Sequence, residues 1–380
     1  MNSTVVSYLA QFESFKTFME SLNTMAGFNT FPLISLLIFV ATAAVLTLIL
    51  ATIGGYGTYA ERKISADLQA RVGPNRVGPY GLLQPLADAV KLLTKEDIFP
   101  ANADKFLFYL APFLAVLGVF ATVAVLPVSS GLALSNLNVG VFYVIAISSL
   151  VGVGVFLGGY ASNSKWSMLG GMRGASQIIS YEIPITISIL AITLLSGGMS
   201  FEKIISNQGG LPNEWFLFHN PFTFLGFFIF FVAGLAETNR APFDLPEAES
   251  ELVSGYHTEY TGMRFALFAL AEYVEVFVLC AVASALFLGG YHLPVPKEVA
   301  SKLPPLALQA GEVSVFFIKA LVLYYVVIWV RWTLPRIRVD RLMSICWKYL
   351  TPIAIFNLVG VSIWMVVFDG KSLIEIIFHH

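Results

Sequence analysis

Long apolar segments alternate with short charged segments along this chain of 380 residues. No charged residue occurs between Glu20 and Glu61, and none occurs between Lys105 and Lys165. A helix needs only about 20 apolar residues to cross the hydrocarbon core of a bilayer, so each interval can hold at least one crossing. The pattern predicts a polytopic membrane protein built from helices.

Apolar runs of bilayer length predict about eight transmembrane helices. They lie near residues 31–58, 106–127, 139–160, 176–196, 221–237, 263–289, 312–332 and 349–368. The uncharged stretch from Phe106 to Ser164 must hold two of them, with the turn near Pro127–Asn138. The predicted fold class is an all-α membrane helix bundle with cytoplasmic amphipathic helices, and residues 1–380 are predicted to form one membrane domain.

Lysine and arginine are distributed unevenly between the two sides of this predicted bundle. Of the 22 basic residues, most lie in the loops that follow the first, third, fifth and seventh spans. Positively charged loops remain in the cytoplasm, so we expect these four loops to be cytoplasmic and both termini to face outward. Three cytoplasmic segments are thereby defined: residues 59–105 with an amphipathic helix, the acidic loop 238–262 and the basic loop 333–348.

The composition excludes several classes of function. The net charge is −2, which gives no basis for nucleic-acid binding driven by counterion release. The two cysteines, Cys280 and Cys346, lie far apart in apolar surroundings, which excludes a disulfide scaffold, a structural zinc site and an all-cysteine iron–sulfur cluster. No metal site is predicted, and any redox chemistry must use a diffusible carrier or one that a partner holds.

The third predicted span is rich in glycine, but its pattern does not indicate a nucleotide-binding loop. Gly152, Gly154, Gly158 and Gly159 approach the G-x-G-x-x-G spacing, yet they lie in a membrane helix and not between a strand and a helix. Small residues four apart allow two helix backbones to approach closely. We therefore expect close helix packing through Gly154 and Gly158.

The first cytoplasmic segment contains a shaped turn and then an amphipathic helix. Two Gly-Pro pairs fix the turn in VGPNRVGPYG, residues 72–81. Leu82, Leu83, Leu86, Ala89, Val90 and Leu93 then recur at three- and four-residue spacing, opposite Asp88, Lys91 and Lys95. Such a helix lies at the membrane interface, either as a surface anchor or as the rim of an opening for an amphiphilic ligand.

Acidic residues are concentrated in one region. Eight of the 24 acids lie between residues 237 and 275: Glu237, Asp244, Glu247, Glu249, Glu251, Glu259, Glu272 and Glu275. Their interleaving with apolar and proline residues suggests a loop that folds back against the bundle. Glu272 and Glu275 lie in the sixth predicted span and Glu182 in the fourth, where an ionisable group costs about 2.5–3.5 kcal/mol or more.

Two interpretations of these acids remain open. A solvated acidic loop is the simpler one. A proton relay is the other, because clustered and buried carboxylates repel one another and so favour protonated forms near neutral pH. The acids inside predicted spans favour the relay.

Four segments carry a resemblance to a known family. They are Glu61-Arg62-Lys63 with the following GPNRVGPYGLLQPLADAVKLLTKE, then SMLGGMRGASQIISYEIP, AETNRAPFDLPEAESELVSGYHTEYTGMRFALFALAEY and RWTLPRIRVDRLMSICWKYLTP. Together they resemble the H subunit of the proton-translocating NADH-quinone oxidoreductases, respiratory complex I, which is called subunit 1 in mitochondria. The similarity extends from about Glu61 to about Val367.

This resemblance implies a translocase subunit that is not catalytic alone. Such subunits dock the peripheral arm, form much of the quinone chamber and begin a polar path that couples quinone reduction to proton translocation. The implied relay acids are Glu182, Glu237, Asp244, Glu247, Glu249, Glu251, Glu259 and Glu272. No family role carries over to Glu275, for which a structural part is equally compatible.

The resemblance also implies quinone-binding arginines. They correspond to Arg62 in the first cytoplasmic loop and to Arg331, Arg336 and Arg338 after span seven. An isoprenoid tail would come from the bilayer while the polar headgroup meets these charges. A guanidinium also binds carboxylates bidentately, so Arg336, Arg338 and Arg341 fit equally well as docking residues for a partner.

The implied cofactors and partners lie mostly outside this chain. The chain itself is expected to bind no cofactor, quinone is the substrate, and FMN and iron–sulfur clusters lie on partner subunits of the two arms. Membrane lipid is a further partner, and nucleic acid is not. The N-terminal 30 residues and Tyr291–Gly311 depart from the family pattern, and we expect a bacterial inner (plasma) membrane location.

Two other functions remain as alternatives. The electron donor of the complex could differ from NADH, as in the related ferredoxin-, F420- and hydrogenase-linked complexes. The AETNR and PFDLPEAESELVSG segments favour the NADH type. A stand-alone secondary transporter would show inverted repeats with paired broken helices, and the two halves of the chain have no such self-similarity.

Overall fold

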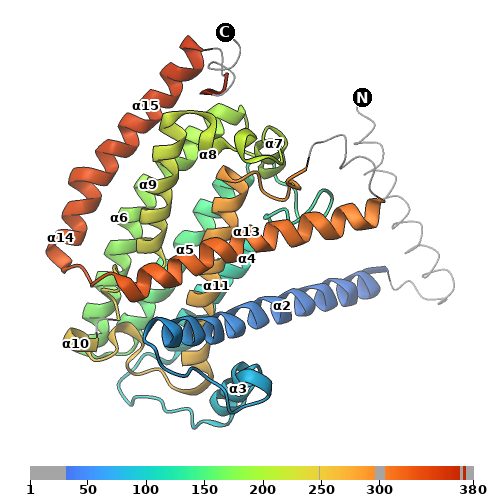
Figure 1. The fold of residues 1–380 in the computed structure, drawn as a ribbon. Helices are drawn as coiled ribbons and strands as arrows, with labels where there is room; N and C mark the ends of the chain where they lie inside the picture. The colour runs from blue at the N-terminus through green and yellow to red at the C-terminus, as the bar shows by residue number, and fades with distance from the viewer. Residues whose placement is uncertain (1–30, 248, 296–303, 369–370, 374–380) are drawn as a thin grey trace. The chain divides into compact units, whose positions relative to one another are not determined.

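The structure is a computed structural model that describes residues 31–247, 249–295, 304–368 and 371–373. Every regular element in these ranges is helical (Figure 1). The residues divide into two compact units, with the boundary inside helix α2 (Phe31–Leu68) between Thr52 and Ile53. In the first unit the Thr47 hydroxyl donates to the Ala43 carbonyl within the helix.

Seven helices are long and apolar enough to cross a membrane, by length and composition. They are Val40–Leu68 of α2, α4 (Lys105–Val123), α5 (Gly140–Ala161), α6 (Lys165–Ser196), α11 (Gly262–Phe287), α13 (Pro305–Thr333), and Val339–Val367, which joins α14 (Val339–Ser344), a π-helical turn and α15 (Thr351–Val367). An eighth apolar helix, α9 (Pro221–Glu237), is shorter. All eight predicted spans are therefore present as helices, and the all-α fold class is confirmed.

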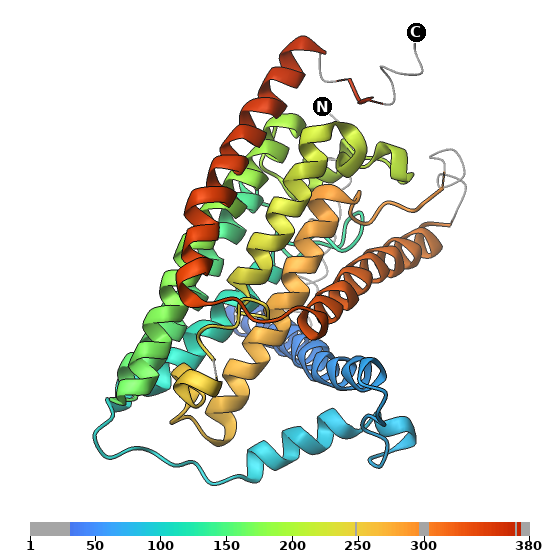
Figure 2. The same cartoon turned by 60° about the vertical axis from the view of Figure 1, so that its left-hand side comes forward.

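Shorter helices connect the spans. They are α3 (Gln84–Thr94), α7 (Phe201–Ser206), α8 (Phe216–His219), α10 (Glu249–Leu252) and three single 3₁₀ turns at Pro79–Gly81, Pro212–Glu214 and Gly255–His257. Helix α3 confirms the predicted amphipathic helix and lies beyond one end of the bundle (Figure 2). Its Leu86 and Leu93 side chains are 65% and 64% exposed, so its apolar face is free to meet a membrane or another apolar surface.

Three predicted boundaries differ from the structure for one physical reason. Helix α2 continues to Leu68, α6 begins at Lys165, and the last span begins at Val339. Glu61, Arg62, Lys165 and Arg173 therefore lie on helices and not in loops. A hydropathy window ends where charges begin, whereas a helix continues wherever its backbone can still hydrogen-bond, including in water beyond the bilayer.

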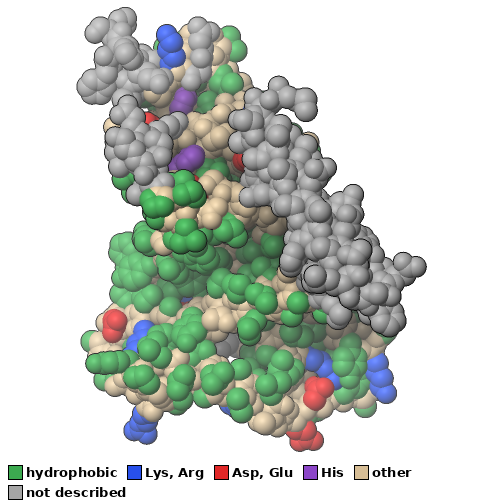
Figure 3. All heavy atoms as spheres, turned by 90° about the vertical axis from the view of Figure 1, so that its right-hand side faces the viewer, with side chains coloured by type: hydrophobic (Ala, Val, Ile, Leu, Met, Phe, Trp, Pro, Cys, Tyr) green, Lys and Arg blue, Asp and Glu red, His purple; other side chains and the backbone are tan. Residues whose placement is uncertain are grey.

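The core of the second unit is formed by α4, α5, α6, α9 and α11, with α15 packed along α6 and α9 (Figure 1). Phe108, Tyr181, Phe230 and Phe287 are among its largest fully buried side chains. By contrast, many apolar side chains on the outer helix faces are exposed, such as Trp329 on α13. Figure 3 shows hydrophobic side chains over much of one face and charged side chains gathered toward its lower end. This distribution is typical of a multi-pass membrane protein.

At the end of the bundle away from α3, two charged side chains make several hydrogen bonds each. The buried Glu312 carboxylate accepts hydrogen bonds from the Ser129 hydroxyl, the Ser130 amide and the Ser130 hydroxyl, at 2.8, 2.8 and 2.6 Å. Lys319 in α13 donates to the carbonyls of Leu288 and Gly290, at 2.7 and 2.9 Å, just beyond the C-terminus of α11. These contacts fix the connections at that end against the spans.

The predicted close packing of α5 is confirmed in part. A Cβ atom on Gly154 would lie 2.9 Å from the Ala115 amide nitrogen and 3.0 Å from the Ala111 carbonyl oxygen, both on the α4 backbone. Gly159 approaches the backbone of α6 in the same way, whereas Gly158 faces the Phe268 ring of α11. The close backbone approach therefore uses Gly154 and Gly159, while Gly158 makes room for an aromatic ring.

We predict that Gly154→Ala destabilises the protein, because the added methyl meets backbone atoms that cannot move unless α4 and α5 separate. Overpacking of this kind costs about 1–3 kcal/mol. The midpoint of thermal unfolding in detergent should fall. Gly55→Ala in α2 is the matched control, since its Cβ would meet only Pro85 at an ordinary 3.4 Å. Equal midpoints for the two variants would contradict the packing argument.

Candidate functional site

The acidic loop between α9 and α11 is folded onto the bundle. The buried Gln177 amide of α6 donates to the carbonyls of Ala236 and Phe243, both at 2.7 Å. Phe243, Leu245 and Leu252 are buried. The prediction that this loop folds back against the bundle is confirmed, and a freely solvated loop does not describe these residues.

Gly255 shows how tightly the loop is folded. Its φ is +59°, and a Cβ atom there would lie 1.7 Å from the Pro246 carbonyl oxygen. Gly170 of α6 meets the same turn, since its Cβ would lie 2.7 Å from the Tyr256 amide. Only glycine fits either position without displacing backbone, so these two residues hold the loop against α6.

A buried arginine lies at the centre of the site. Arg240, at the end of α9, is 4% exposed and forms ion pairs with Glu61 of α2, at 2.9 Å, and Glu272 of α11, at 2.8 Å. Its guanidinium also lies over the Tyr273 ring, 4.1 Å from the ring centre. Arg331 at the end of α13 binds the other Glu61 oxygen at 2.7 Å. Four separate segments of the chain therefore meet at this ion cluster.

The carboxylates keep Arg240 charged. Burial alone would lower the pKa of its guanidinium, but Glu272 and Glu61 raise that pKa above its usual value. A charged group buried without partners is strongly disfavoured, whereas one with two carboxylates and an aromatic face is compensated. Arg240 therefore supplies a fixed positive charge next to the acids of the loop.

Glu247 lies beside this cluster with two hydrogen-bonding neighbours. The Tyr256 hydroxyl donates to Glu247 Oε1 at 3.3 Å, and His257 Nδ1 lies 3.4 Å from the same oxygen. Burial raises the pKa of the Glu247 carboxyl well above its usual value, and repulsion from Glu272 and Asp244 raises it further. Burial lowers the pKa of His257 to about 4. The neutral forms of both groups are therefore favoured.

A cavity inside the bundle holds three further carboxylates. Glu182 of α6, Glu237 of α9 and Glu275 of α11 line it, together with the hydroxyls of Thr122, Ser148 and Thr238 and ten apolar residues. The cavity offers about 50 Å³ to the centres of water molecules. One water needs at least about 10–15 Å³ by this measure, so the cavity can hold a few. The cavity is therefore mainly apolar, with three carboxylates and three hydroxyls on its wall.

Other predicted acids lie at the edge of this arrangement. Glu251 is exposed and pairs with Arg173 of α6 at 2.6 Å and with Arg336 at 3.3 Å. The hydrogen bond from Arg173 lowers the pKa of the Glu251 carboxyl. Glu259 makes no ion pair or hydrogen bond with any described residue. The side chain of Glu249 lies outside the described residues, so its predicted role stays a prediction.

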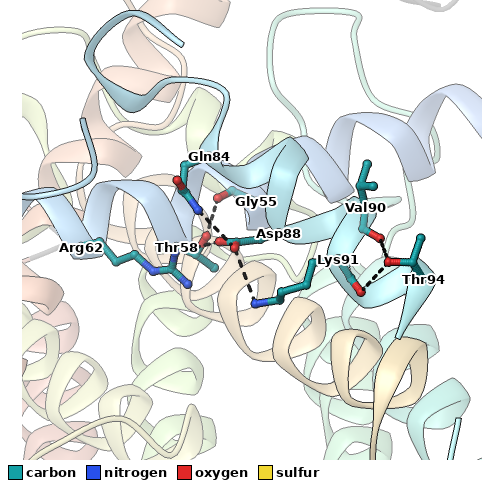
Figure 4. Close-up of polar contacts among 8 residues, drawn as sticks. All are labelled: Gly55, Thr58, Arg62, Gln84, Asp88, Val90, Lys91 and Thr94. Atoms are coloured by element: carbon teal, nitrogen blue, oxygen red, sulfur yellow. Dashed lines mark hydrogen bonds and ion pairs between the residues drawn. The ribbon is translucent and has the colours of Figure 1, made fainter. Parts of the chain in front are cut away.

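The four predicted quinone-binding arginines are dispersed. Arg331 joins the buried cluster, while Arg336 pairs with Glu251 and Arg338 is exposed. Arg62 reaches from α2 to Asp88 of α3 at 2.7 Å, and Lys91 approaches the other oxygen of that carboxylate at 3.7 Å (Figure 4). The Gln84 amide also donates to Asp88, so this carboxylate fixes α3 to the end of α2 (Figure 4).

Several residues of the site have no role predicted from the sequence. No relay or quinone-binding role is predicted for Glu61, Arg240, Tyr256 or His257. All four nevertheless lie in the segments that carry the family resemblance. Glu61 and Arg240 form an ion pair although they are 179 residues apart in the sequence, and no local sequence pattern predicts such a contact. His257 and Tyr256 could have been suspected, because they follow the acids directly and precede Gly262 at the start of α11.

The fold and the site together define a multi-pass membrane protein that carries a buried ion cluster and an acid-lined cavity. A model of the NADH dehydrogenase family matches residues 40–362, and the chain belongs to that family. It is similar to the H subunit of the NADH-quinone oxidoreductase of Anaeromyxobacter dehalogenans, with 50% identity over 85% of this chain and 82% of the relative.

Similar proteins occur in other organisms. The relative from Chlorobaculum tepidum is 49% identical over 82% of this chain and 88% of its own length. That from Salinibacter ruber is 43% identical over 83% of this chain and 92% of its own length. Both are likewise H subunits of NADH-quinone oxidoreductases.

We predict that Arg240→Met strongly destabilises the protein, because Glu61 and Glu272 would remain buried without their shared cation. Removing one partner of a buried ion pair costs about 3–5 kcal/mol. The fall in thermal midpoint should be partly reversed in Arg240→Met/Glu272→Gln. Arg62→Met is the matched control, since Arg62 is about half exposed and exposed pairs contribute only about 0–1 kcal/mol. Equal falls in the thermal midpoint for Arg240→Met and Arg62→Met would contradict a stabilising role of the ion cluster.

Proposed function

We propose that the chain is the H subunit of a proton-translocating NADH-quinone oxidoreductase, and that it couples quinone reduction to proton movement. It acts within the assembled complex and is not catalytic alone. The observation that carries the proposal is the presence, in one helix bundle, of the ion cluster of Arg240 and of a cavity lined by three carboxylates.

In this proposal the relay consists of the acids of the loop and of the spans. The members are Glu182, Glu237, Asp244, Glu247, Glu249, Glu251, Glu259 and Glu272. Glu247 receives the strongest support, because its carboxyl is partly buried, favours its proton, and lies next to both a phenol and an imidazole. Moving one charge against 100 mV costs about 2.3 kcal/mol, which is comparable with a pKa change of about two units.

The quinone headgroup is proposed to bind near Arg62, Arg331, Arg336 and Arg338. Arg331 makes the direct link to the relay, because its guanidinium binds Glu61, which in turn binds Arg240. A change of charge near Arg331 would therefore act on the Glu61 and Glu272 carboxylates. The exposed apolar face of α3 supports the proposal that this helix forms the rim through which the isoprenoid tail passes.

The exposed arginines also fit a docking role. Arg336 and Arg338 follow α13 and are exposed, as is Arg341 in α14. Carboxylates on the peripheral arm would bind such guanidinium groups bidentately. In the proposed assembly that arm carries the FMN and the iron–sulfur clusters, and the chain contributes quinone contacts and the beginning of the proton path.

The proposed location is the inner membrane of a bacterial cell, with both termini on the outer side. The acidic loop 238–262, the segment 59–105 and the segment 333–348 then face the cytoplasm, where a peripheral arm can dock. The first ten residues of segment 59–105 lie on α2, so the helix extends beyond the bilayer at this end.

We predict that Glu247→Gln lowers proton translocation and quinone reduction while the complex still assembles. Glutamine resembles the protonated carboxyl but cannot release a proton. Loss of a group that transfers protons costs about 10²-fold or more. Because the pKa of Glu247 is raised, the wild-type carboxyl loses its proton only as the pH rises through that higher pKa, so translocation should decline on the alkaline side. The variant should lack this decline.

Vesicles from cells with the replaced subunit allow these measurements. Electron flow from NADH to an artificial acceptor at the flavin reports assembly and should be unchanged. Glu96→Gln is the matched control, since Glu96 is exposed and lies outside the relay. Normal quinone reduction together with normal proton translocation in Glu247→Gln would refute the relay assignment. Transport by the purified chain alone would favour a stand-alone transporter instead.

The proposed orientation predicts which loops react with an impermeant thiol reagent. Lys165→Cys, at the turn between α5 and α6, should react only in inverted vesicles, whereas Asn213→Cys, between α7 and α8, should react in intact cells. Both positions are exposed. The native Cys280 and Cys346 are buried, so they give little background. The opposite labelling pattern would reverse the proposed topology.

A further inference from the structure

We propose that Glu275 is a proton-carrying residue that joins the ion cluster of Arg240 to the acid-lined cavity, and that it belongs functionally to the same relay. This inference rests on the proposed function and extends it to a residue for which the family resemblance supplies no role. Its basis is the position of Glu275 on α11. Glu272 of the ion cluster lies one turn before it, and Glu275 itself lines the cavity together with Glu182 and Glu237.

The first observation is the lining of the cavity. Glu182, Glu237 and Glu275 come from three different helices, α6, α9 and α11, and face one common space. The other polar lining groups are hydroxyls. The Thr122 hydroxyl donates to the Val119 carbonyl, while the Ser148 hydroxyl lies near the Ile145 carbonyl and also interacts with the Glu237 carboxyl. The cavity therefore contains acids and hydrogen-bond acceptors but no basic side chain among its described lining.

The second observation is the spacing along α11. Glu272 and Glu275 are three residues apart, so they lie on the same side of the helix one turn from each other. Glu272 pairs with Arg240 at 2.8 Å and so belongs to the ion cluster. Glu275 lines the cavity and interacts electrostatically with Glu237, with Glu272 and with Arg240. Among the acids that line the cavity, Glu275 is the one directly adjacent in α11 to the cluster.

The third observation is the lack of a structural partner. Within the described residues Glu275 makes no hydrogen bond and no ion pair, in contrast to Glu312, whose carboxylate accepts three hydrogen bonds. An ionisable group in a membrane helix costs about 2.5–3.5 kcal/mol or more. A carboxylate that only stabilised the bundle would be expected to have bonding partners like those of Glu312. A cavity with room for water is the environment that a proton carrier needs.

The transfer step conserves charge and atoms. The step begins when the Glu272 carboxylate has accepted a proton from an acid of the loop. The Glu275 carboxylate then takes this proton, directly or through one water, as one O–H bond breaks and another forms. Glu275 then gives this proton to the Glu237 carboxylate and returns to its starting state. One negative charge has moved from the cavity to Glu272, where Arg240 compensates it. No oxidant, reductant or cofactor takes part in the step.

The test compares Glu275→Gln with Glu275→Asp in the assembled complex. Glutamine keeps the size and hydrogen-bonding capacity but cannot carry a proton, whereas aspartate can carry one on a shorter side chain. We expect Glu275→Gln to lower proton translocation and coupled quinone reduction about tenfold. This is less than the roughly 10²-fold loss for a group acting directly, because water can bridge part of the gap. Glu275→Asp should retain most of the activity.

A purely structural role gives the opposite order, with glutamine tolerated at least as well as aspartate, and that result would overturn the proposal. Val278→Ala is the matched control, because Val278 lines the same cavity one turn further along α11 and carries no proton. Its turnover should remain normal. A loss in Val278→Ala as large as that in Glu275→Gln would mean that cavity shape matters and would also overturn the proposal.

Glu237→Gln separates failure of this inference from failure of the proposed function. If Glu237→Gln is impaired and Glu275→Gln is normal, the relay stands and Glu275 lies outside it. If both are normal, the relay itself is refuted. If both are impaired and Glu275→Asp is active, the proposal is supported. Redox-induced infrared difference spectra give a readout independent of turnover, since a carboxylic acid band present in the wild type should be missing or diminished in Glu275→Gln.

Discussion

The buried pairing of Arg240 with Glu61 and Glu272 is the interaction on which the arrangement of the site depends. It joins the end of α9 to α2 and α11, and Arg331 extends it to α13. Burying a charge is so unfavourable that each of these groups requires the others in place. The cluster therefore does more than stabilise four segments: it fixes one positive charge at the point where the acidic loop enters the bundle.

Charged side chains in different parts of the bundle differ in how many hydrogen-bonding partners they have. At one end Glu312 accepts three hydrogen bonds from serine hydroxyls and an amide, and Lys319 donates to two carbonyls, so both charges are held in place. At the other end Glu61 pairs with two arginines, whereas Glu275 in the cavity makes no hydrogen bond or ion pair with any described residue. A carboxylate with several donors is held in one position, whereas one without partners in a space that can hold water is able to exchange a proton.

The sequence predicted the helices better than it predicted the contacts between them. Apolar runs of bilayer length predicted all eight spans, and acids interleaved with apolar and proline residues correctly indicated a folded acidic loop. The ends of α2 and α6 were misplaced, because the charges of Glu61 and Arg173 ended the hydropathy signal while the helices continued. The Glu61–Arg240 pair and the position of Glu275 on the cavity wall follow from helix packing, which no local pattern encodes.

The double hydrogen bond of Gln177 has a mechanical consequence. One amide group of α6 holds the last turn of α9 and the beginning of the acidic loop together, through Ala236 and Phe243. A displacement of the loop at Phe243 that leaves α9 in place would break one of the two hydrogen bonds and leave a buried carbonyl without a donor. Gln177 therefore couples the position of the loop to that of α9.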